Sequence, residues 1–200
     1  MPSFTLVVTE GILDVTVGER LLDQLGIERI YTRFIPKGGG DAFWRECPRY
    51  NQAARHAGPV LGLADLEQAP CPSGLIANHL PAGRESGFVV RIAERMVESW
   101  LMADRARLSE YLRVSPARIL ANPETYPHPK QALVDVARHS TRREVREDIV
   151  PEAGSKGIVG RGYTTRISEF IRQYWRPLDA QRNSPSLARA ITAISAAAHV

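Results

Sequence analysis

The sequence predicts an α/β protein in which a parallel β-sheet carries helices on both faces and is followed by an α-helical C-terminal part. Short continuous apolar runs recur in the first half of the 200-residue chain, segments with helical spacing separate them, and beyond residue 94 the pattern is only helical. Continuous apolar strands that alternate with helices are typical of a parallel sheet buried on both sides.

Four runs predict the strands of this sheet. They are FTLVVT (residues 4–9), RIYTRFI (29–35), PVLGLA (59–64) and GFVVRIA (87–93). Helical spacing predicts helices over residues 15–27 and 41–57, and the GGG at 38–40 breaks the chain before the second of them. Right-handed crossovers would place such helices on both faces of the sheet.

The second half of the chain contains four segments with helical spacing. They cover residues 94–112, 128–140, 163–175 and 184–198. Ser184 ahead of Pro185 is a helix N-cap followed by a proline in the first turn. We therefore expect an α/β domain over residues 1–103 and a helical extension over 104–200 that packs on it, with one continuous domain as the alternative.

Charge and composition limit the cellular setting. The net charge is +4, but residues 1–100 carry 10 Lys and Arg against 12 Asp and Glu, whereas residues 101–200 carry 16 against 10. An acidic half suits metal binding and a basic half suits polyanions.

The N-terminus lacks the pattern of a secretory signal, and no apolar run is long enough for a membrane span, so we expect a cytoplasmic protein without a membrane partner. Cys47 and Cys71 are read as reduced thiols.

Carboxylates follow two of the predicted strands. Glu10 leaves the first strand, with Asp14 one turn further on, and Asp65 and Glu67 end the third. Functional groups of open α/β sheets collect beyond the carboxyl ends of the strands. Residues two apart in an extended chain point to the same side, so Asp65 and Glu67 could share a hard cation. Alone, Asp65 could equally cap the next helix, and Glu10 could be a solvated loop acid.

The motifs VVTEGILD and LGLADLE resemble the TOPRIM domain, the metal-binding α/β module of primases, topoisomerases, recombination proteins and nucleases of the overcoming-lysogenization-defect type. Further segments, including RIAERMVESWLMADR, HPKQALVDVARHS and SPSLARAI, extend the resemblance over almost the whole chain to a family of small bacterial TOPRIM-like proteins classed as a domain of unknown function. The resemblance implies a TOPRIM-like, that is Rossmann-like, fold.

The resemblance also implies a chemistry. Glu10 becomes the general acid/base or a metal ligand, and Asp65 and Glu67 become ligands of Mg²⁺, with Mn²⁺ an alternative. The reaction implied is metal-dependent cleavage of DNA or RNA. Glu67 departs from the family pattern, which has Asp there, and its longer side chain would shift the ion. Many similar proteins are encoded beside ATPases of the ABC or SMC type, so an ATPase partner and a role in defence against phage are implied. The oligomeric state stays open, a homodimer included.

The sequence contains two further candidate sites. Glu98 could join the acidic cluster if its helix begins at the strand ends, or it could be an exposed helical acid; Glu94, four residues earlier, would share its helix face. The glycine-rich segment GSKGIVGRGY (154–163) could bind a substrate phosphate through Lys156, Gly160 and Arg161, or it could be a plain connector. His128 and His139 are read as surface or capping residues.

Three other functions stay open beside the nuclease. The chain could be a catalytically silent TOPRIM-like subunit that binds nucleic acid or regulates an ATPase. Small-molecule phosphoryl transfer is a second alternative, although the Asp-x-Asp-x-Thr start of haloacid dehalogenases is missing. A toxin that acts on RNA is the third, since nothing in the sequence separates RNA from DNA.

Overall fold

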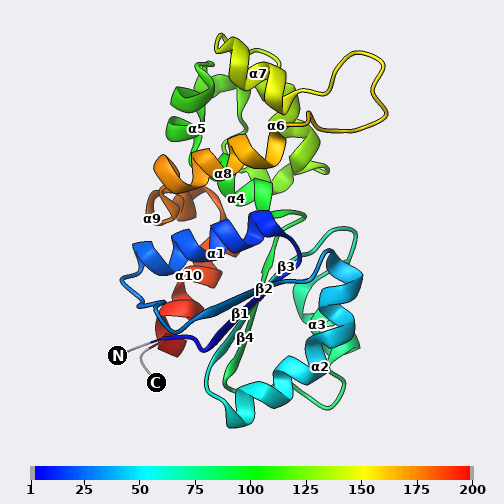
Figure 1. The fold of residues 1–200 in the computed structure, drawn as a ribbon, viewed down its shortest axis with the longest axis vertical. Helices are drawn as coiled ribbons and strands as arrows, with labels where there is room; N and C mark the ends of the chain where they lie inside the picture. Colours follow the sequence, from blue (N-terminus) through cyan, green and yellow to red (C-terminus); the bar gives the residue numbers. More distant parts are fainter. Residues whose placement is uncertain (1–2, 199–200) are drawn as a thin grey trace.

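The computed structural model describes residues 3–198 and contains a four-stranded parallel sheet between two layers of helices (Figure 1). In chain order the strands are β1 (Leu6–Thr9), β2 (Arg33–Pro36), β3 (Val60–Asp65) and β4 (Phe88–Ala93). They lie in the order β2-β1-β3-β4, and every neighbouring pair is parallel. An α/β fold with a parallel sheet and a helical C-terminal part is therefore confirmed.

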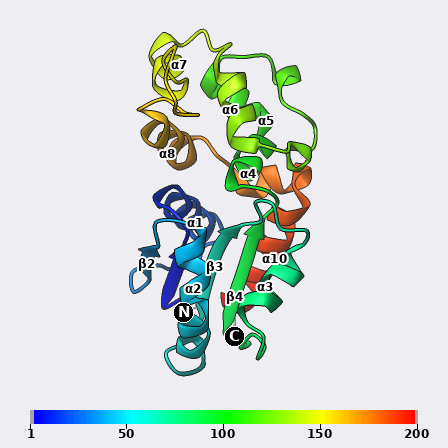
Figure 2. The same ribbon diagram turned by 90° about the vertical axis from the view of Figure 1, so that its right-hand side faces the viewer.

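Helices cover both faces of the sheet, as Figures 1 and 2 show. The first layer consists of α1 (Ile12–Gln24) and α10 (Pro185–Ala198), and the second of α2 (Gly40–His56) and α3 (Pro72–His79). Successive strand residues point to opposite faces. Val7 accordingly belongs to the apolar cluster that contains α1 and α10 residues, and Val8 to the cluster under α2. Burial from both sides explains why these strands are continuously apolar.

The chain beyond β4 is helical. Its helices are α4 (Val97–Ala103), α5 (Arg105–Leu112), α6 (Pro129–Ala137), α7 (Arg143–Ile149), α8 (Tyr163–Gln173) and α9 (Pro177–Ala180), followed by α10. Short 3₁₀ turns are η1 (Pro116–Arg118), η2 (Pro123–Thr125) and η3 (Gln181–Asn183). Ser184 Oγ accepts a hydrogen bond from Leu187 N at 3.3 Å, so the predicted N-cap of the last helix is confirmed. None of the helices formed by residues 3–198 is long and apolar enough to cross a membrane.

The segment predicted as helical over 94–112 is two helices. Arg95 has a φ of 62°, and the first helix begins only after Met96, so the prediction that Glu94 shares a helix face with Glu98 is wrong. The second break is at Asp104, whose side chain caps α5 by accepting from Arg107 N at 3.3 Å. The expected division between residues 103 and 104 falls at this break, but one apolar cluster extends from β1 to α10 across it.

Two other boundaries differ from the sequence prediction, and one helix was not predicted. The strand predicted over 29–35 starts at Arg33, because Ile30 and Tyr31 lie in the preceding turn with 75% and 85% of their surface exposed. The first helix starts at Ile12 rather than residue 15. The helix that was not predicted is α3, which follows β3. Cys71 caps it, and Pro72 occupies its first turn, where proline is favourable.

Candidate functional site

Glu10 directly follows β1 at the carboxyl edge of the sheet, and only 8% of its surface is exposed. The N–H groups of Gly38 and Gly39 donate to its carbonyl oxygen at 2.8 and 2.9 Å. Both glycines have positive φ, a conformation that other residues rarely adopt. A Cβ atom on Gly40 would lie 3.1 Å from Glu10 Oε2, so this glycine leaves room for the carboxylate. Gly38, Gly39 and Gly40, which lie at the start of α2, therefore position Glu10.

Backbone N–H groups hold three carboxylates at this edge. Asp65 N donates to Glu10 Oε1 at 3.1 Å, and Val97 N donates to Asp65 Oδ1 at 2.8 Å. Gly11 N donates to Asp14 Oδ2, also at 2.8 Å, in the first turn of α1. The hydrogen bonds link the ends of β1 and β3 with the starts of α1 and α4. These segments thus come together at the carboxyl edge of the sheet, where the acidic site was predicted.

Glu98 adds a carboxylate from the first turn of α4, and only 1% of its surface is exposed. Its Oε1 accepts from the Tyr163 hydroxyl at 2.9 Å and lies 3.5 Å from Lys130 Nζ. Its Oε2 is buried without a hydrogen-bond partner among residues 3–198. Because a buried unpaired carboxylate oxygen is costly, this atom calls for a donor or a cation that the described residues do not supply.

These carboxylates perturb one another. Burial raises the pKa of Glu10 to about 7, and the charge of Asp14 contributes. Burial also raises the pKa of Asp14 to about 6, with a contribution from Glu98. The pKa of Asp65 lies well above its ordinary range, first because of burial and then because of the three neighbouring carboxylates. The Lys130 ammonium acts in the opposite direction on the pKa of Glu10 and Asp14. Glu98, Glu10, Asp14 and Asp65 are called the acidic cluster below.

Glu67 lies beside the acidic cluster but not in the predicted geometry. The chain is not extended there, because Glu67 has a φ of 49°, and its side chain is exposed. Its backbone pairs with Arg95, since Glu67 N donates to Arg95 O and Arg95 Nη1 to Glu67 O, both at 2.8 Å. Glu67 and Arg95 are two of the three described non-glycine residues with positive φ. Such strained conformations concentrate at functional sites.

A hollow of about 510 Å³ opens beside the cluster. Glu10, Asp65 and Glu67 line it together with the glycine turn and the start of α2. Asp41 adds a fourth carboxylate to its wall, whereas Arg45 is the one Lys or Arg side chain that the described residues contribute to it. An acidic hollow of this kind attracts cations and repels an anionic ligand that arrives without one.

The residues fit a hard divalent cation in their chemistry. Carboxylate oxygens are the ligands that Mg²⁺ prefers, and Glu98 Oε2 is a buried oxygen with no other described partner. Within residues 3–198, however, no three His, Cys, Asp or Glu side chains converge as a ready coordination shell. The backbone donors explain this arrangement, because they direct the oxygens of Asp14 and Asp65 to separate N–H groups.

The second predicted site lies in the connection between α7 and α8. The Gly160 N–H group donates to Ile149 O at 2.8 Å and is therefore engaged in the fold. Lys156 is exposed, and Arg161 lies 3.9 Å from Glu152 on the surface. The hollow beside Gly160 and Arg161 is lined by more carboxylates than cations, which is unfavourable for a phosphate.

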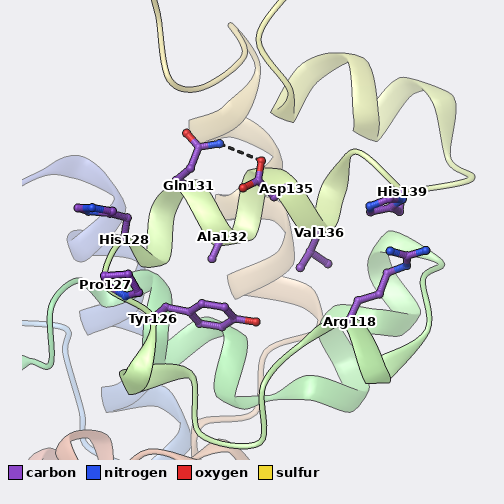
Figure 3. A pocket seen from close by; sticks show the side chains of 9 residues that line it. All are labelled: Arg118, Tyr126, Pro127, His128, Gln131, Ala132, Asp135, Val136 and His139. Atoms are coloured by element: carbon purple, nitrogen blue, oxygen red, sulfur yellow. Dashed lines mark hydrogen bonds between the residues drawn. The ribbon is translucent and has the colours of Figure 1, made fainter.

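Another hollow, of about 420 Å³, lies along α6, and its lining includes the two histidines that were predicted to lie at the surface (Figure 3). His128 and His139 stand at opposite ends of its lining, over a floor that includes Ala132 and Val136. No residue of the acidic cluster lines it.

Sequence reasoning missed Lys130, Tyr163 and the positioning role of the Gly38–Gly40 turn. Lys130 and Tyr163 are 32 and 65 positions from Glu98 in the chain, and only tertiary packing brings them to it. The glycine run was a detectable signal, since three consecutive glycines after a strand indicate a close approach of the backbone.

Comparisons with protein-family models, with curated proteins and with solved structures gave no match to this chain.

Proposed function

We propose that this chain is a Mg²⁺-dependent, TOPRIM-like nuclease that cleaves phosphodiester bonds in DNA or RNA. The acidic cluster carries this proposal, since four carboxylates at the carboxyl edge of a parallel sheet lie near enough to influence one another's charge, and one of their oxygens is buried without a described partner. Carboxylates gathered in this way are stabilised by a divalent cation.

Each residue of the site has a distinct part in the proposed reaction. Asp65 and Glu98 would hold the cation, and Asp14 and Glu67 would add negative charge beside it. When bound, the cation supplies positive charge that stabilises the phosphoryl group in the transition state. Glu10 would accept or give a proton, and burial raises its pKa toward neutrality in the site without a cation.

Lys130 is the basic group that complements this site. Its ammonium lies 3.5 Å from Glu98 Oε1, and its side chain is 32% exposed, so it reaches both the buried acid and solvent. A phosphodiester that approaches the acidic cluster would find a positive charge there. This contact would come from α6, in the helical half of the chain.

The TOPRIM-like relationship and the partner follow from the motif resemblance. On that basis we propose that the chain acts with an ABC- or SMC-type ATPase in defence against phage. The chain would supply the nuclease and the partner the ATP hydrolysis.

A catalytically silent subunit is the second candidate function. Two observations favour it: Glu67 lies in a turn with positive φ and is exposed, and the carboxylates do not converge on one point in the described residues. In that case the acidic cluster would bind a cation for stability or regulation and cleave nothing.

The test is a cleavage assay on plasmid DNA, linear DNA and tRNA with Mg²⁺, with Mn²⁺ and with chelator, with and without an ATPase encoded beside it. We expect metal-dependent cleavage that Asp65→Asn lowers by about a hundredfold or more. Asp41→Asn is the matched control, since it removes a carboxylate from the same hollow but not from the acidic cluster; it should keep most of the activity.

Melting temperatures of the same proteins distinguish the alternatives. If no substrate is cut while Mg²⁺ raises the melting temperature of wild type but not of Asp65→Asn, the silent-subunit function replaces the nuclease. If neither cleavage nor melting responds to metal, the metal site itself is refuted.

A further inference from the structure

A further hollow, of about 390 Å³, lies at the end of α4 that is remote from Glu98. It is formed where α5 begins and where α9 and η3 pass beside it. Four arginines line it, namely Arg105, Arg107, Arg176 and Arg182. Its volume is within the range of small-molecule sites, about 300–1,000 Å³.

Most of the guanidinium donors in this hollow are unused by the protein. Arg105 donates through Nη2 to Pro116 O at 3.0 Å, and its Nε is buried without a partner among the described residues. Arg107 is paired with Glu110 at 2.7 Å. Within residues 3–198, the side chains of Arg176 and Arg182 make no hydrogen bond or ion pair, and both residues are exposed.

The two carboxylates in the lining do not neutralise these arginines. Asp104 is buried, and both of its oxygens accept backbone hydrogen bonds, from Arg107 N at 3.3 Å and from Arg176 N at 2.8 Å. Asp179 lies exposed in the lining. Asp104 thus fixes the two backbone segments that present the arginines, and positive charge remains in excess.

We propose that this hollow binds a phosphate group, carried either by a small molecule such as a nucleotide or by the backbone of a nucleic-acid strand. The planar guanidinium group offers a fork of donors that matches two phosphate oxygens, and several forks around one concave site are typical of phosphate recognition. Arg105 would be the inner donor, and Arg176 and Arg182 would close over the ligand from the rim. The proposal is independent of the acidic cluster.

The experiment measures binding in chelator, so that a metal at the acidic cluster cannot contribute. Pyrophosphate and AMP are titrated by calorimetry, and a labelled single-stranded oligonucleotide of about ten nucleotides is titrated by fluorescence anisotropy. The test variant is Arg176→Ala/Arg182→Ala, which removes exposed side chains without described partners and should fold normally. The control is Arg33→Ala/Arg49→Ala, with the same charge change on exposed residues outside the hollow.

We expect at least one probe to bind wild type and the control alike and the test variant about tenfold more weakly or worse. Tighter binding of pyrophosphate or AMP would identify a small-molecule phosphate as the ligand, and tighter binding of the oligonucleotide would identify a strand backbone. If no probe binds wild type, or if the test and control variants lose affinity equally, the proposal is overturned.

Discussion

Glu10 is a carboxylate that the fold buries beside other carboxylates, and its ionisation is therefore linked to stability. The unfolded chain releases this proton near the ordinary pKa of 4.5, whereas the folded chain keeps it until about pH 7. Between these values the folded state binds more protons, so the free energy of unfolding falls as pH rises. The contribution of protonated Glu10 to stability is therefore complete below the unfolded pKa of 4.5, and it is lost as pH rises through the folded pKa of about 7. The raised pKa values of Asp14 and Asp65 act in the same direction.

Glu10→Gln should remove part of this pH dependence. Gln keeps an oxygen that can accept from Asp65 N but carries no charge. In chelator, we expect wild type to lose stability from about pH 5 to pH 8, and the variant to lose about 1–3 kcal/mol less over that range. Urea unfolding at both pH values measures the difference.

Glu152→Gln is the control for this comparison. Its side chain is 74% exposed in the α7–α8 connection, so the same chemical change there should leave the pH dependence of wild type intact. Parallel pH dependence of Glu10→Gln and wild type would show that Glu10 does not carry the linkage.

The acids of the site were predictable one residue at a time, but their contacts were not. Glu10, Asp14 and Asp65 follow strands or begin helices, positions that the sequence pattern reveals. The donors to Glu98 come from α6 and α8, whose placement depends on how the helical half packs. Glu67 lines the hollow, but the direction of its side chain was not predictable, because Glu67 itself lies in a turn with positive φ.

Among the elements, β1, β3 and β4 were predictable because each is buried on both faces and is therefore continuously apolar. The edge strand β2 was predicted too long, since the β-rich letters at Ile30 and Tyr31 belong to an exposed turn. The short helix α3 was missed, although Pro72 in its first turn is a helix-start signal.

The connection between α7 and α8 depends on close backbone packing at Gly160. A Cβ atom there would approach Asp148 O to 2.3 Å and Val150 O to 2.8 Å, both backbone atoms that cannot rotate away. Gly160 N also donates to Ile149 O, which ties the connection to the end of α7. The glycines of this segment therefore have a packing function.

Gly160→Ala should destabilise this connection by about 1–3 kcal/mol, because the added methyl group forces the backbone segments apart. Urea unfolding measures the loss, and hydrogen exchange should show lower protection at the end of α7. Gly157→Ala is the matched control: its nearest contacts would be at 3.4 and 3.5 Å, so we expect a change near zero. Equal stability of the two variants would contradict the packing argument.

At the scale of the whole molecule, one apolar cluster joins the sheet to the helical half. It contains residues of β1, β3 and α1 as well as of α5, α6, α8 and α10. Trp100 shows the connection, since Trp100 Nε1 donates to Ser186 Oγ at 2.7 Å. The carbonyl oxygen of Trp100 in turn accepts from Trp175 Nε1 at 3.2 Å. The break between α4 and α5 at Asp104 is thus a boundary between two helices inside a shared core.

A fragment of residues 1–103 should therefore fail to fold alone. Without α8 and α10, one face of the sheet and the outer side of α1 would be exposed to water. We expect the fragment to lack a cooperative urea transition and to bind a hydrophobic dye, whereas the full chain unfolds in one transition. A cooperative transition in the fragment would show instead that residues 1–103 form an autonomous domain.

The order of protein synthesis gives the Glu98 contacts a consequence in time. A ribosome produces the carboxylates of the acidic cluster within the first 98 residues, but the two described donors to Glu98 are residues 130 and 163. A nascent chain therefore contains all four acids before it contains the two residues that contact Glu98. A chain can assemble this site only after residue 163 has been made, so a product terminated between residues 98 and 163 would carry the acidic residues without their native arrangement.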